Sequence, residues 1–400
     1  MNARLPAVPA PQLSPCREAA SGHALAGLFI SGLLMSFLGA VLPAWGFHLR
    51  DDLYTAGNLF VALNAGILAG VALATHKLRR RSVRFTLAMG NVAACASLLL
   101  LSYASTPLAS TSWRYLGVGG LGLAAGMLNT AILRAISPLY KRDAAATVNL
   151  AGAIFGLGCV TTALLVAGTY YVYTVPSILI LFATIPGLLA IHYSRVEFAP
   201  VEEREERPLG TVLDELKNPA AILFSLLLFF QFGNEWTLAG WLPVLLIRHV
   251  GLSPATSVVF LAVYWAALLT GRVAAQLLLR TMSHGRLLLG SLTSALFGCV
   301  LLGFTPSRVG AAVAVILIGC GFAAIYPLVV EKIGNRFPHY HPGLYNGIFS
   351  FAVTGGLIAP WLVGFVATVL GIGAVIIFPL FGTLAVLLLV LAIMLHARFA

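Results

Sequence analysis

"SRVEFAPVEEREERPLGTVLDELKNP", from Ser194 to Pro219, is the longest polar stretch of a 400-residue chain that is 60% hydrophobic and only 9% charged. It holds seven of the 13 acidic residues. The segments on either side of it are apolar and about 20 residues long, which is the length that a helix needs to cross ~30 Å of hydrocarbon. No soluble domain has this composition. The stretch therefore indicates a loop that divides a membrane protein into two halves.

Six apolar segments precede this loop and six follow it. Their expected spans are Ala24–Phe47, Tyr54–Thr75, Phe85–Ala104, Tyr115–Ile136, Ala145–Ala167, Val175–His192, Ala220–Ile247, Ala255–Leu279, Leu287–Leu302, Gly310–Val330, Tyr345–Val369 and Val375–His396. The sequence predicts an all-α membrane protein with twelve transmembrane helices. Its parts are a disordered N-terminal tail (1–22), a six-helix bundle (23–193), a central loop (194–219) and a second six-helix bundle (220–400).

Short motifs recur in the two halves in the same order, at an offset close to 200 residues. The pairs are VLP at Val41–Pro43 with WLP at Trp241–Pro243, LAG ending at Gly70 with LTG ending at Gly271, GLGLAA at Gly120–Ala125 with GCGFAA at Gly319–Ala324, and Asn149 and Gly158 with Asn346 and Gly355. Each match alone is weak, but four ordered matches indicate an internal repeat. The two bundles are therefore expected to be pseudo-symmetric.

The basic residues are distributed asymmetrically between the two sides of this topology. With the N-terminus inside, 19 of the 24 Lys and Arg lie on the inner side, and only Arg50, Arg114, Arg248 and Arg308 lie outside. This follows the positive-inside rule, so we expect both termini and the central loop to be cytoplasmic. The net charge of +11 then requires no nucleic-acid partner. Short loops without glycosylation sequons favour a plasma membrane of bacterial inner-membrane type.

Two parallel six-helix repeats joined by a cytoplasmic loop resemble the major facilitator superfamily, whose substrate site lies near the midplane between the halves. Several stretches resemble its fucose permease and glucose transporter-like branch. They are GAVLPAWGFHL (39–49), GVGGLGLAAGMLN (117–129), VNLAGAIFGLG (148–158), GNEWTLAGWLP (233–243), TGR (270–272), GFAAIYPLVVEKIGNRFP (321–338) and NGIFSFAVTGGLIAP (346–360). The resemblance implies a cavity lined by the first, fourth, seventh and tenth helices. It also implies an inner gate at Arg79, Arg80 and Arg81, although His76 stands near the place of the superfamily's usual Asp.

Glu235 is the only acid that falls near the middle of a predicted span; the other twelve lie in loops, in the tail or at a helix end. A charge at that depth costs at least ~2.5–3.5 kcal/mol, so such residues usually face a polar cavity. Gln231, Asn234 and Trp241 share its helix face. Apolar surroundings favour the neutral acid, so Glu235 could exchange a proton near neutral pH. The alternative is a permanently protonated Glu235 that only links helices.

Other polar residues at depth are few. The resemblance favours Asn129 and Tyr326 as ligand contacts, because both lie on cavity helices, and helix packing is an equal alternative for each single Asn. For Asn149 and Asn346 a role in helix packing is favoured, since glycines accompany them at both repeat positions. Arg134 and Arg272 lie near inner helix ends, where they could snorkel to the interface in structural or gate roles.

Amides and aromatic rings without a midplane cation suit an uncharged polyhydroxylated ligand. We therefore expect a monomeric secondary symporter for a small neutral solute such as a monosaccharide, working by alternating access. Protons, or alternatively sodium, would be the coupling ion, and no cofactor or metal is expected. A multidrug or organic-cation antiporter, an uncoupled facilitator and a receptor stay open as alternatives. An enzyme is not expected, because no histidine and no second acid lies at depth to form a metal site or a carboxylate dyad.

Overall fold

A computed structural model describes residues 15–80, 82–106, 108–136, 144–198, 219–336 and 342–399. Six long helices precede the central loop: α1 (Pro15–Val41), α2 (Leu53–Arg80), α3 (Val83–Ala104), α4 (Thr111–Ala135), α6 (Ala144–Thr169) and α7 (Val175–Tyr193). Six follow it: α9 (Pro219–Val250), α10 (Pro254–Leu278), α11 (His284–Phe304), α12 (Arg308–Arg336), α13 (Pro342–Leu370) and α14 (Ala374–Phe399). All twelve contain a segment long and apolar enough to span a membrane, which confirms the predicted fold class.

The first helix begins earlier than the sequence predicts. α1 starts at Pro15, so residues 15–22 of the expected disordered tail are helical. Proline is favoured in the first turn of a helix, and the following Arg, Glu and two Ala are good helix formers. Residues 1–14 of the tail and 199–218 of the central loop lie outside the described part of the chain.

The two halves repeat the same helix packing. In the first half α1 packs on α6, α2 on α4, and α3 on α4 and α7. The corresponding pairs of the second half are α9 with α13, α10 with α12, and α11 with α12 and α14. The closest crossings are equivalent too. A Cβ at Gly158 would overlap the carbonyl oxygen of Phe29, and a Cβ at Gly355 would overlap that of Phe229. The pseudo-symmetry is therefore present in atomic detail.

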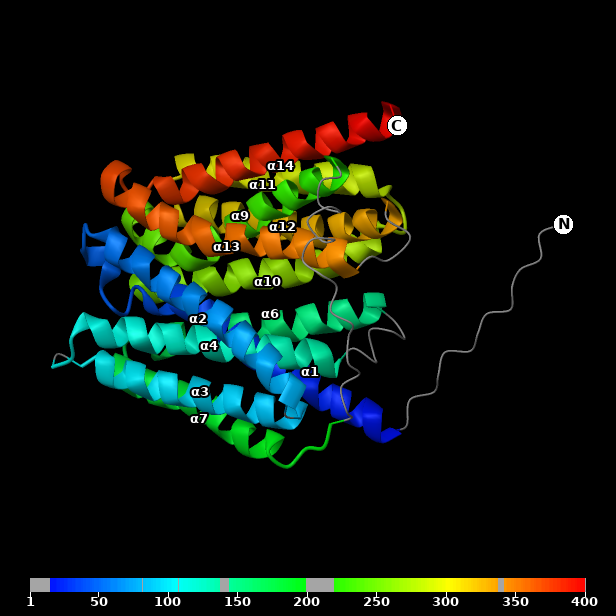
Figure 1. Ribbon diagram of the computed structural model, residues 1–400. Coiled ribbons are helices and arrows are strands. Elements are labelled where there is room, and N and C mark those ends of the chain that lie inside the picture. Colours follow the sequence, from blue (N-terminus) through cyan, green and yellow to red (C-terminus); the bar gives the residue numbers. More distant parts are fainter. Residues whose placement is uncertain are drawn as a thin grey trace.

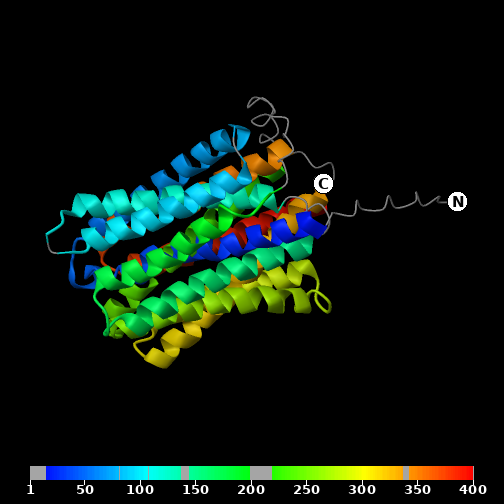
Figure 2. The same ribbon diagram turned by 90° about the horizontal axis from the view of Figure 1, so that it is seen from below.

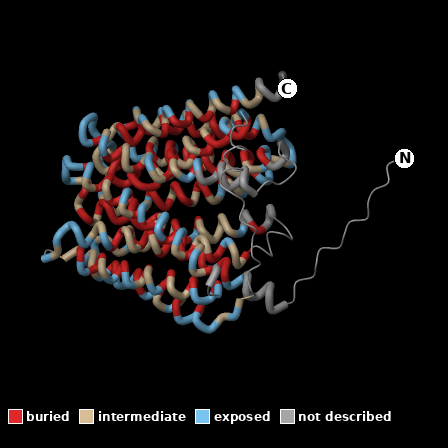
Figure 3. Tube along the Cα trace, viewed as in Figure 1, coloured by how far each residue is buried: buried red, intermediate tan, exposed pale blue. Residues whose placement is uncertain are grey.

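Figure 1 shows the first half as the lower layer and the second half as the upper layer. α1 begins and α14 ends at the same end of the molecule, which Figure 2 also shows; we call it the terminal end, and its opposite the distal end. Buried residues concentrate between the helices (Figure 3), whereas large apolar side chains such as Leu133, Leu188 and Phe297 are exposed on outer faces. Such faces suit lipid contact, since lipid tails are as apolar as these side chains.

Candidate functional site

Glu235 lies inside the protein, about halfway along α9. Its side chain is buried, with 8% of the residue exposed, and its Oε1 accepts a hydrogen bond of 2.8 Å from Nε2 of Gln231, one helical turn earlier. Tyr264 of α10 donates a hydrogen bond of 3.3 Å to the backbone oxygen of Glu235. Oε1 of Gln231 is buried and has no hydrogen-bond partner within the described residues. A buried acceptor without a partner is costly and marks a place where a ligand could bind.

Arg272 brings a positive charge into the same region. Its guanidinium lies against α6: a Cβ at Gly152 would stand 2.9 Å from its Nη1. Its positive charge acts on Glu235, although no ion pair joins the two side chains among the described residues. Its Nε is buried and unpaired within the described part of the chain. Gly152 leaves room for the guanidinium between the halves, and the structural or gate role of Arg272 stays a prediction.

Arg272 belongs to a row of residues by which α10 faces α6. Trp265 packs edge-on against Phe155 at 6.4 Å, and Leu269 lies over Gly156. Spacings of four and three residues place Trp265, Leu269 and Arg272 on one helix face. Trp265 Nε1 is also buried without a partner among the described residues. The contact between α6 and α10 thus combines close packing with two unpaired donors.

Asn234 and Trp241 point to neighbouring helices of their own half. Nδ2 of Asn234 donates to Oγ1 of Thr383 on α14 at 3.4 Å, and Nε1 of Trp241 donates to the Pro360 oxygen on α13 at 2.8 Å. Trp241 is fully buried, and its ring lies 5.6 Å from that of Phe60 on α2. Both side chains therefore have structural hydrogen bonds, and their role in substrate binding stays a prediction.

Asn129 and Tyr326 are the half-buried members of the predicted site. Asn129 Oδ1 on α4 accepts a hydrogen bond of 2.5 Å from Oγ of Ser31 on α1. The Tyr326 ring on α12 lies 5.5 Å from the ring of Phe232 on α9. In the described residues α4 and α12 share no extensive contact. These two side chains therefore belong to opposite halves, and their role as ligand contacts stays a prediction.

The remaining predicted residues lie near the terminal end. Arg134 is half-buried in the last turn of α4. Arg79 and Arg80 end α2, Asn149 lies on α6 and Asn346 on α13, but the side chains of these four are outside the described part, as is all of Arg81. Their gate or packing roles stay predictions.

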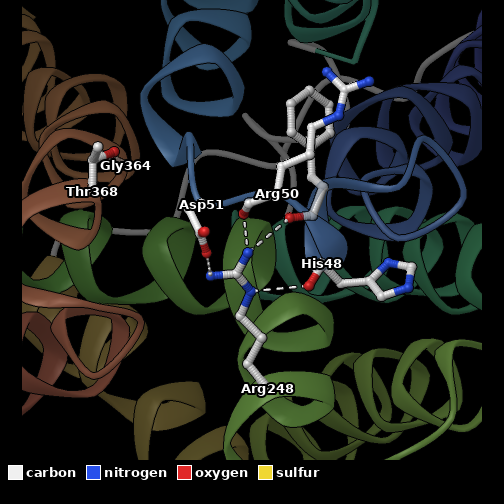
Figure 4. A network of polar contacts seen from close by, with 7 residues as sticks. His48, Arg50, Asp51, Arg248, Gly364 and Thr368 are labelled. Carbon is white, nitrogen blue, oxygen red and sulfur yellow. Dashed lines mark hydrogen bonds and ion pairs between the residues drawn. The ribbon is translucent and has the colours of Figure 1, made fainter.

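Arg248, which the sequence marks only as an outer charge, joins the two halves at the distal end. From the end of α9 it donates to backbone oxygens of the short helix η1 (Phe47–Leu49) and of Arg50, with 3.0 Å from Nε to the His48 oxygen (Figure 4). Its Nη1 lies 3.9 Å from Oδ1 of Asp51, whose full exposure makes this ion pair weak. Burial and, more weakly, the charge of Arg248 hold the pKa of His48 below its usual value of 6.5.

Tight helix crossings close the distal side further. A Cβ at Gly39 of α1 would overlap the Ala239 carbonyl oxygen of α9, and Gly57 of α2 lies against Gly364 of α13. Nearer the middle, Asn64 Nδ2 donates to the Leu357 oxygen of α13 at 2.5 Å. The halves are therefore locked together at the distal end.

The family model described as the Major Facilitator Superfamily matches residues 24–360. The chain belongs to the major facilitator superfamily. It is accordingly a secondary transporter and an integral multi-pass membrane protein, not an enzyme, as the sequence predicted.

Similar proteins agree with this assignment. An uncharacterized MFS-type transporter of Yersinia pestis is 25% identical over 166 residues, so the match spans 42% of this chain and 42% of that relative. Two crystal structures of the nucleoside transporter NupG share the fold. A mutant form has a TM-score of 0.73 at 13% identity, covering 94% of this chain and 99% of that one. The other has a TM-score of 0.68 at 12% identity, covering 97% and 100%. The structural likeness extends to the whole facilitator fold and does not single out the fucose permease branch.

Proposed function

We propose that this transporter carries a small neutral polar solute together with a proton, and that Glu235 binds the proton. The observation that supports this most is the buried pair of Gln231 and Glu235, in which a carboxyl group lies beside an amide oxygen that has no partner among the residues that the structure describes. A carboxylic acid at this depth is stable only if it is neutral or compensated. Binding and release of a proton there would therefore be linked to the conformation of the site.

The charges around the site favour a neutral solute over an ion. The positive charge of Arg272 acts on Glu235 and so offsets part of the cost of an ionised carboxylate, although the two side chains form no ion pair in the described part of the chain. A substrate cation would have to compete with this guanidinium, and a substrate anion would have to compete with the carboxylate. In a medium of low dielectric constant, an uncompensated charge is far more costly than hydrogen bonds to hydroxyl groups. This argues against the organic-cation antiporter.

Amide and aromatic groups suit a ring that carries hydroxyls, and we propose a monosaccharide as the first substrate class. A nucleoside is the second candidate. The aromatic pairs Phe155 with Trp265, Trp236 with Trp265, and Phe232 with Tyr326 favour a ligand that has an additional flat ring. The solved nucleoside transporter NupG has the same fold.

Counterflow in proteoliposomes tests the substrate class. Labelled hexoses or nucleosides should exchange, and labelled organic cations should not. Gln231→Leu should raise the half-saturating concentration about tenfold, as expected for one lost ligand hydrogen bond. Asn91→Leu is the matched control, because Asn91 is a buried amide of α3 that donates to Leu87 of its own helix. Exchange of organic cations without sugars or nucleosides would refute the proposal.

The charge asymmetry also supports a defined orientation, in which the terminal end is cytoplasmic. An impermeant thiol reagent added outside intact cells should leave Cys16 and a cysteine at Glu203 unmodified. It should modify a cysteine that replaces Leu49, which is 79% exposed at the distal end. The opposite labelling pattern would reverse the orientation.

A further inference from the structure

An apolar hollow lies at the terminal end of the second half, away from Glu235. Four helices line it: α9, α11, α12 and α14. Each contributes the part that lies closest to the terminal end of the molecule. The walls are apolar, with Phe224, Leu227, Leu288, Val390 and Ile393 among the lining side chains. Two polar side chains, His284 and Lys332, complete the lining. The space that water-sized groups can enter is about 30 Å³, so the hollow has room for a few methylene groups of an alkyl chain.

The equivalent place in the first half is filled. There Tyr193, at the end of α7, is fully buried, and its hydroxyl donates to the His23 oxygen of α1 at 2.8 Å. A Cβ at Gly27 would stand 2.9 Å from that hydroxyl. At the repeat offset of 200 residues, Ile393 takes the place of Tyr193. The side chain of Ile393 is shorter and leaves unfilled the space that Tyr193 occupies in the first half.

The charge at this site is positive. Oε1 of Glu331 lies 2.8 Å from Nε2 of His284, so this carboxylate already has a partner. Lys332 is exposed and has no carboxylate partner within the described residues, and Arg280 and Arg286 are exposed at the same end. An apolar chamber beside an unpaired ammonium group is complementary to a molecule with an alkyl chain and an anionic head.

We infer that this hollow binds an anionic phospholipid, with part of an acyl chain between α9, α11, α12 and α14 and the phosphate at Lys332. α11 and α14 also carry exposed apolar side chains, Phe297 and Phe381, on their outer faces. The hollow therefore adjoins helices that suit contact with lipid. A basic residue at a membrane surface attracts an anionic headgroup. The site is separate from the proposed solute site and does not depend on its substrate.

Native mass spectrometry of the full chain in detergent, titrated with phosphatidylglycerol or phosphatidylcholine, tests this inference. The wild type should retain phosphatidylglycerol in preference. Lys332→Gln should weaken that retention about fivefold, the effect of one basic group near a headgroup. Lys77→Gln, which removes the same charge from the end of α2, should leave it unchanged. Ile393→Tyr introduces the tyrosine that the first half has at the equivalent position. This variant should lose the retention of phosphatidylglycerol while the protein stays monodisperse.

Equal losses from Lys332→Gln and Lys77→Gln would mean that charge on the whole terminal end attracts the lipid, and would overturn the site. Equal retention of the two phospholipids, or retention of oleate without phosphatidylglycerol, would overturn it as well. Since Lys332→Gln alters only an exposed side chain, the test does not depend on the folding of the Ile393→Tyr variant.

Discussion

Glu235→Gln is expected to abolish accumulation of the solute against its gradient while equilibrium exchange persists. The amide has nearly the shape of the acid and can still bond Gln231, so the site keeps its form. It cannot bind and release a proton, however, and without that step the proton gradient cannot drive transport. In proteoliposomes with an imposed proton gradient, the internal concentration of labelled solute should stop rising at the external value, whereas counterflow should continue.

Asp52→Asn is the matched control for this experiment. Asp52 is an exposed acid that bonds Thr55 at the start of α2, so its neutralisation should leave accumulation at the wild-type level. If Glu235→Gln accumulates solute as well as the wild type, Glu235 has only a structural role.

Gly39→Ala should hold the distal side open and slow transport about tenfold. The added Cβ would overlap the Ala239 carbonyl oxygen of α9, and this neighbour is backbone that cannot rotate away. Overpacking of this kind costs typically 1–3 kcal/mol, and here that cost falls only on the conformation in which α1 and α9 touch. A cysteine at Phe60, which is 6% exposed between the halves, reports the change. It should react with a bulky maleimide faster in the Gly39→Ala background.

Gly168→Ala provides the comparison, because no atom lies within 4 Å of a Cβ at that helical position. It should change neither transport nor labelling. Unchanged labelling of the Phe60 cysteine in Gly39→Ala would show that the crossing of α1 and α9 is not part of the distal closure.

The spans and the repeat were predictable because lipid imposes one rule on every helix. A segment must be apolar over about 20 residues, and a charged residue inside it is so costly that it usually serves a function. That rule located the twelve helices and singled out Glu235. The motif offset also anticipated the equivalent crossings at Gly158 and Gly355, since close helix approach requires a residue without a side chain.

The partners of individual side chains were not predictable in this way. Helical periodicity placed Asn234 and Trp241 on the face of Glu235, but it cannot say which neighbouring helix that face meets; here α14 and α13 supply the partners. Arg248 bonds backbone oxygens, which carry no sequence signal. Arg272 turns towards α6 because of Gly152, 120 residues away along the chain.

The most direct test of proton-coupled transport is the pH inside proteoliposomes when solute is added outside in the absence of any imposed proton gradient. Wild-type protein should acidify the interior as solute enters, and Glu235→Gln should abolish this acidification. Solute entry through the wild type without any change in internal pH would contradict the account.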